Sequence, residues 1–102
     1  MNILVENKRQ ELGALCKLHK VSALSLFGSV AKNSMNENSD IDFLVRFSED
    51  IDVLEYSDNY FSLLHKLELL FKRHIDLVSE KSLKNAVLIA EIERTKILVY
   101  AA

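Results

Sequence analysis

The stretch Asp40-Ile41-Asp42-Phe43-Leu44-Val45-Arg46-Phe47 lies near the middle of the 102-residue chain and alternates in polarity along most of its length. Such alternation predicts a β-strand, because successive side chains of a strand point to opposite faces of a sheet. The two predicted faces are Ile41, Phe43, Val45 and Phe47 on one side, and Asp40, Asp42, Leu44 and Arg46 on the other. The stretch therefore predicts a strand with an apolar core face and a mostly polar second face.

Helical and strand-like segments flank this strand on both sides. Apolar residues at helical spacing predict helices, and short apolar runs predict strands. The further elements expected are helices over 5–19, 57–73 and 83–94, a helix beginning near Ser29, and strands over 21–27, 74–78 and 96–100. The resulting order α-β-α-β-α-β-α-β predicts an α/β (α+β) fold with a mixed sheet and helices packed on it.

The composition limits the classes of partner. With 13 basic and 15 acidic residues the net charge is −2, and the basic stripe typical of proteins that hold a long nucleic acid is missing from the sequence. The single cysteine, Cys16, excludes an internal disulfide and favours a cytoplasmic protein. No apolar run reaches the about 18 residues of a membrane span. We expect one domain over residues 1–102.

A pair of carboxylates stands on the polar face of the central strand. Asp40 and Asp42 are two positions apart, which places their side chains on the same side about 6–7 Å apart. Mg²⁺ binds through one or two carboxylates together with phosphates and waters, so the pair suits a metal platform for phosphoryl transfer. Asp76, out of phase with Ile75 and Leu77, is the candidate third ligand if strand 74–78 lies beside this one.

Gly28-Ser29 stands where the strand over 21–27 gives way to the predicted helix. A glycine at this point lets a phosphate approach the backbone, and a helix N-terminus presents free N–H groups and partial positive charge. The Ser29 hydroxyl adds a further donor. The pair therefore predicts a cradle for the phosphates of a nucleotide.

Gly28-Ser29-Val30-Ala31 followed by Ser39-Asp40-Ile41-Asp42-Phe43-Leu44-Val45 resembles the signature of the polymerase β-type nucleotidyltransferase superfamily, and specifically its minimal nucleotidyltransferase branch. The resemblance extends over nearly the whole chain. One departure is Lys32-Asn33 where the family pattern has Arg-Gly. Lysine keeps the charge of arginine but not its bidentate geometry.

The resemblance implies a fold, a reaction and a partner. It implies transfer of AMP from ATP to a hydroxyl, with two Mg²⁺ ions. The residues to which it assigns roles are Asp40, Asp42 and Asp76 as catalytic metal ligands, and Gly28, Ser29 and Lys32 as nucleotide contacts. Many members of this branch are antitoxins that silence a HEPN-domain toxin by adding AMP to one of its tyrosines, which makes such a toxin the expected partner.

Two alternatives remain open from the sequence. One is an antitoxin that only binds and masks its toxin, although the three carboxylates expected of an active site are all present. The other is a nucleotidyltransferase for small molecules, whose relatives carry an additional domain to hold the acceptor. A chain of this length leaves no residues for that domain, so we expect the acceptor site to be completed by a partner or by a homo- or hetero-oligomer.

Charged residues near these elements are expected to be structural. Arg46 shares the face of Asp40 and Asp42 and is expected to form a local ion pair. The acidic loop that contains Asp50 and Asp52 is expected to be solvated. His74 is expected to be a surface histidine, and because it shares the polar face of the Asp76 strand, a role near the site stays open.

Overall fold

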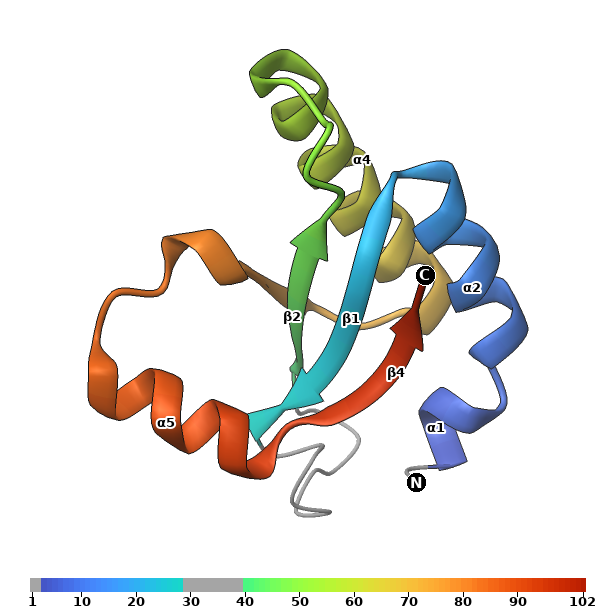
Figure 1. Cartoon of the computed structure of the whole chain (residues 1–102). Helices are drawn as coiled ribbons and strands as arrows, with labels where there is room; N and C mark the ends of the chain where they lie inside the picture. Colours follow the sequence, from blue (N-terminus) through green and yellow to red (C-terminus); the bar gives the residue numbers. More distant parts are fainter. Residues whose placement is uncertain (1–2, 29–39) are drawn as a thin grey trace.

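A computed structural model of the chain describes residues 3–28 and 40–102 (Figure 1). The described elements are α1 (Ile3–Glu6), α2 (Arg9–Leu18), β1 (Val21–Phe27), β2 (Ile41–Phe47), α4 (Val53–Phe71), β3 (Ile75–Ser79), the 3-10 turn η1 (Glu80–Ser82), α5 (Ala86–Thr95) and β4 (Ile97–Ala101). The predicted mixture of helices and strands is confirmed, and the helix expected to begin near Ser29 lies outside the described residues. No helix in these two ranges is long and apolar enough to cross a membrane.

The described strands form one mixed sheet in the order β3-β2-β1-β4. β1 pairs antiparallel with both β2 and β4, whereas β2 pairs parallel with β3. The parallel register sets Asp42 opposite Asp76. The strand adjacency that the sequence left undetermined is therefore present, and it brings two of the predicted carboxylates side by side.

One face of the sheet is packed against α2 and α4 (Figure 1). Phe43 on β2 is fully buried there, and its ring lies 5.8 Å from that of Phe71 on α4, measured between centroids. Burial of such a side chain is worth about 1.5–3 kcal/mol. The same core contains the fully buried Leu24 and Leu26 of β1 and Leu63 and Leu67 of α4. The predicted core face of β2 is confirmed, and this apolar layer fixes the position of the strands.

α5 covers part of the opposite face. Leu44 points to this face by strand alternation, yet it is only 3% exposed. It lines a cavity together with Ile89 and Ile92 of α5. The mostly polar face predicted for β2 is therefore polar at Asp42 and Arg46 but sealed by α5 at Leu44.

Three predicted helix boundaries need correction. The helix expected over 5–19 is split into α1 and α2, because Lys8 leaves helical geometry at φ −114° and ψ 11°. α4 begins at Val53 rather than at residue 57, because the Asp52 carboxylate caps its first turn, accepting from the Glu55 N–H at 2.8 Å. α5 begins at Ala86 rather than 83, with Asn85 as its cap.

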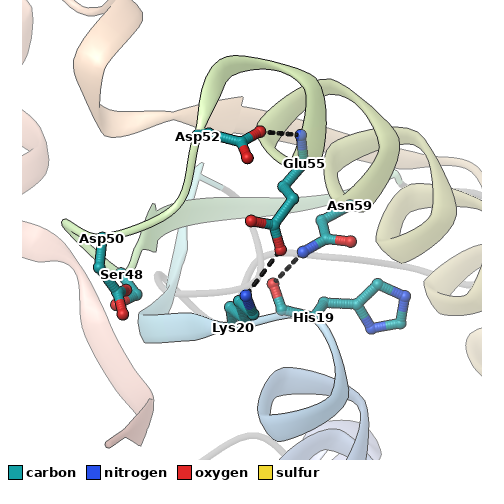
Figure 2. Close-up of polar contacts among 7 residues, drawn as sticks. All are labelled: His19, Lys20, Ser48, Asp50, Asp52, Glu55 and Asn59. Carbon is teal, nitrogen blue, oxygen red and sulfur yellow. Dashed lines mark hydrogen bonds and ion pairs between the residues drawn. The ribbon is translucent and has the colours of Figure 1, made fainter.

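Polar contacts attach the α2–β1 corner, defined as His19 and Lys20, to α4 (Figure 2). The Lys20 ammonium lies 2.6 Å from a Glu55 carboxylate oxygen, and the Asn59 amide donates to the His19 carbonyl at 3.0 Å. The buried His19 ring contacts the Ser62 hydroxyl at 2.8 Å. Since β1 begins at this corner, these contacts help to fix the start of the central strand relative to α4.

Candidate active site

Asp42 and Asp76 occupy neighbouring positions on β2 and β3. Both alternate with core residues, so their side chains project from the face opposite α4. The two carboxyl groups are close enough for the charge of Asp76 to act on Asp42. The pair of acids predicted from the sequence is thus brought together by the parallel register of two strands.

The surroundings of Asp42 disfavour its negative charge. Burial of the carboxyl group is the largest cause, followed by the charges of Asp76 and Asp40 and by the hydrogen bond with Asp76, and together they raise the pKa of Asp42. Partly desolvated carboxylates that repel one another are costly for a fold unless a cation or proton lies between them. This electrostatic arrangement is typical of a functional site.

Gly28 follows β1 and lies directly against the Asp42 carboxylate. The end of β1 is adjacent to this residue because Phe27 is the register partner of Asp42. A Cβ atom built on Gly28 would lie 2.2 Å from Asp42 Oδ2, and the backbone has a left-handed φ of +71°. Both observations require glycine here. The structure therefore adds a contact with a carboxylate to the phosphate role that the sequence predicts for Gly28.

Asp40 lies at the same edge but faces a different neighbour. Its Oδ2 atom is 3.2 Å from Nδ1 of His74, and both side chains are more than half exposed. The Ile41 N–H also donates to the His74 carbonyl at 3.2 Å, which joins the starts of β2 and β3. His74 is thus the neighbour of Asp40, a contact that the sequence did not single out.

The donor set suits a hard cation at the Asp42–Asp76 pair. Mg²⁺ prefers carboxylate oxygens and needs only one or two of them when phosphates and waters complete its shell. In residues 3–28 and 40–102, no group of three or more His, Cys, Asp or Glu side chains is arranged so that it could hold a metal ion. The described pair therefore fits the chemistry of Mg²⁺, and Asp40 as a further ligand stays a prediction.

Two predicted nucleotide contacts, Ser29 and Lys32, lie outside the described residues. Their roles stay predictions. Arg46, in contrast, forms the expected local ion pair, with its Nε atom 3.3 Å from Glu80 Oε2.

Sequence reasoning missed the wall that stands beside the acids. α5 and the segment before it place Leu83, Ile89 and Ile92 over Leu44, two positions along β2 from Asp42. The available signal was Leu44 itself, because a leucine on an otherwise polar strand face indicates that another element covers it.

Sequence relatives carry names that agree with this site. The family model described as the nucleotidyltransferase domain matches residues 8–99. A Methanocaldococcus jannaschii protein with the provisional name protein adenylyltransferase is 36% identical over 81 residues, which is 79% of each chain. The protein adenylyltransferase MntA of Thermococcus cleftensis is 30% identical over 86 residues, covering 76% of this chain and 83% of its own.

Solved structures share the same fold. A provisionally named minimal nucleotidyltransferase superposes with a TM-score of 0.69 at 31% identity, over 91% of this chain and 90% of its own. A toxin–antitoxin crystal structure with AMP-PNP gives 0.70 at 23% identity, covering 92% and 73%. A tri-AMPylated HEPN toxin of Shewanella oneidensis in complex with MNT antitoxin gives 0.65 at 20% identity, covering 95% and 72%.

The match to the family covers most of the chain. The mixed sheet, with its glycine and paired aspartates, is the arrangement that the sequence signature predicts. This chain therefore belongs to the nucleotidyltransferase domain family.

Proposed function

We propose that this protein transfers AMP from ATP to a tyrosine hydroxyl of a HEPN-domain toxin and thereby acts as its antitoxin. The observation that carries the proposal is the Asp42–Asp76 pair, closed on one side by Gly28. Two adjacent carboxylates that repel each other, beside a position that requires glycine, form a site for cations and phosphates.

The relatives support the choice of nucleotide and acceptor. Curated relatives at 30–36% identity are named protein adenylyltransferases. Among the structures with the same fold, one toxin–antitoxin complex contains AMP-PNP, and in another the HEPN toxin is AMPylated. These names favour ATP as the donor and a toxin protein as the acceptor over a small-molecule acceptor.

The proposed chemistry assigns a role to each acidic residue. Asp42 and Asp76 would hold Mg²⁺, with Asp40 as the predicted further ligand, and the bound ion would neutralise charge on the triphosphate and on the departing pyrophosphate. Because Gly28 has no side chain, the end of β1 leaves room for the Asp42 carboxylate and for a phosphate beside it. Asp76 accepts the proton of the tyrosine hydroxyl. The tyrosine oxygen then bonds to the α-phosphorus of ATP while the bond from that phosphorus to pyrophosphate breaks.

The test uses the chain together with the HEPN-domain protein of its own genome, beginning with the adjacent reading frame. The two proteins are incubated with Mg²⁺ and each nucleoside triphosphate in turn, and intact masses are measured. We expect a gain of one or more AMP units on the toxin with ATP, mapped to tyrosine, and no gain with Asp42→Asn. Tight binding without any mass change would contradict AMP transfer and support an antitoxin that acts by masking alone.

A further inference from the structure

A cavity of about 230 Å³ lies between Leu44 of the sheet and α5. Its floor is Leu44, which shares a strand face with Asp42 and lies two positions along β2, about 6–7 Å away. Its walls are Leu83, Ile89 and Ile92, and Glu80 and Glu93 complete the lining. The end of the cavity at Leu44 is therefore two strand positions from Asp42.

The wall of the cavity is built by local contacts. The Asn85 carboxamide oxygen accepts from the N–H groups of Val87 and Leu88 at 2.9 and 3.1 Å, which fixes the start of α5. The Leu83 N–H donates to the Glu80 carbonyl at 3.2 Å, which closes the turn before it. These contacts fix the turn that carries Leu83 and the start of the helix that carries Ile89.

The charges of the cavity are already neutralised. Glu80 pairs with Arg46 at 3.3 Å, and Glu93 pairs with Lys96 at 2.9 Å. The side chains that line the cavity include no cation to bind a phosphate, so the cavity does not suit the triphosphate of the donor. A purine would also leave its ring nitrogens without donors, because the lining side chains are apolar or are carboxylates that only accept.

We propose that this cavity holds the aromatic ring of the acceptor tyrosine, an inference that rests on the proposed AMP transfer. A phenol ring is apolar on both faces and along its edge, and it has one polar atom at its far end. With the ring over Leu44 and between Leu83 and Ile89, the hydroxyl extends toward Asp76 and Asp42. Serine and threonine have no ring to fill the cavity, so the cavity selects tyrosine among the hydroxyl residues.

A binding experiment tests the cavity without any catalysis. The methyl resonances of Leu44, Leu83, Ile89 and Ile92 are followed by NMR while p-cresol, the side chain of tyrosine as a free molecule, is added. We expect these methyls to shift in the wild-type protein and not in Ile89→Trp, whose added ring fills the cavity. Adenosine should leave them unmoved. Shifts with adenosine alone, or with neither probe, would overturn the proposal.

Transfer to the toxin provides the second measurement. Ile89→Trp should slow AMP transfer to the toxin by about tenfold or more, because a filled pocket rejects the acceptor, while the KM for ATP stays unchanged. Val87→Trp is the matched control, since Val87 is on the same helix but 80% exposed, and it should transfer at the wild-type rate. Leu83→Phe serves as a second variant if Ile89→Trp does not fold.

The two proposals fail in different ways. If the wild-type protein transfers no AMP, the proposed function is wrong, and the p-cresol titration still decides whether the cavity accepts a phenol ring. If the wild-type protein and Ile89→Trp transfer AMP equally well, the function stands and the assignment of the cavity is wrong. A raised KM for ATP in Ile89→Trp would instead assign the cavity to the nucleotide.

Discussion

Two acidic clusters in this molecule differ in how their charges are satisfied. Around the α2–β1 corner, Asp52 caps α4, Glu55 pairs with Lys20, and Asp50 accepts from the Ser48 hydroxyl (Figure 2). At the edge formed by β2 and β3, Asp42 and Asp76 instead face each other. Each acid of the first cluster has a donor, whereas the carboxyl groups of the second are exposed to each other's charge.

The two clusters show how to separate structural acids from functional ones. The Ser48 hydroxyl lowers the pKa of Asp50, whereas burial and the neighbouring carboxylates raise the pKa of Asp42. The fold gains stability from the first arrangement and loses it at the second. Carboxyl groups with a raised pKa are typical of functional sites, and this pair has the donor chemistry that suits a divalent cation.

The largest expected effect is the loss of AMP transfer in Asp42→Asn. Asp42 is expected to hold the Mg²⁺ that offsets the phosphate charge. Loss of that stabilisation costs several kcal/mol in the transition state, so the rate of transfer should fall about a thousandfold or more. The rate is measured from AMP incorporated into the toxin. Asp52→Asn is the matched control, because asparagine caps a helix as well as aspartate. Equal losses in both variants would remove the distinction between the clusters.

The second-largest effect is expected for Gly28→Ala. The added Cβ would lie 2.2 Å from Asp42 Oδ2, and alanine at a φ of +71° is strained, so the carboxylate must move. A displacement on the order of 1 Å at a reacting centre reduces rates about a hundredfold, and we expect that loss in AMP transfer. Gly13→Ala is the control, because no atom lies within 4 Å of its Cβ in α2. Unimpaired transfer by Gly28→Ala would show that the contact with Asp42 has no catalytic role.

A smaller effect is expected at the satisfied cluster. Asp52→Ala removes the cap of α4, which should lower the free energy of unfolding by about 1 kcal/mol in a urea titration. The rate of AMP transfer should be unchanged, since α4 packs on the face of the sheet away from the acids. A marked loss of activity with unchanged stability would contradict the purely structural role assigned to Asp52.

The smallest effects are expected in the pH dependence of stability. The pKa of Asp42 is raised in the folded state, so ionising this carboxyl group destabilises the fold. This cost to the free energy of unfolding is absent below the ordinary pKa of 3.8 and develops as pH rises through the folded-state pKa. Asp42→Asn should therefore be more stable than wild type at pH 7 and equal to it in acid. Asp50, with a lowered pKa, gives the opposite sign: Asp50→Asn should be less stable at pH 7. Urea titrations across this range measure both, and differences of the same sign would contradict the comparison.

Much of the fold could be predicted because its elements have strong local patterns. The strand over Val21–Phe27 was predicted with both bounds, and the alternation of Ile41, Phe43 and Val45 identified the buried face of β2. Helix starts were less predictable. The acidic run before α4 has the composition of a solvated loop, and only the folded chain shows that Asp52 turns toward the Glu55 N–H. The break before α2 has only a weak signal in Asn7, which is a poor helix former, because the neighbouring Lys8 and Arg9 are good ones.

By itself, the sequence determined which residues could perform chemistry and in what order the elements occur. Gly28, Asp40, Asp42 and Asp76 are defined by their position within their own strand or turn, which depends on local periodicity. The tertiary structure decided which of them meet, because strand pairing depends on contacts between residues far apart in the chain: the parallel register joins Asp42 to Asp76, and Asp40 turns to His74. The wall formed by α5 over Leu44 is also a tertiary feature, since the 3.6-residue period of a helix says which face is apolar but not what that face will cover.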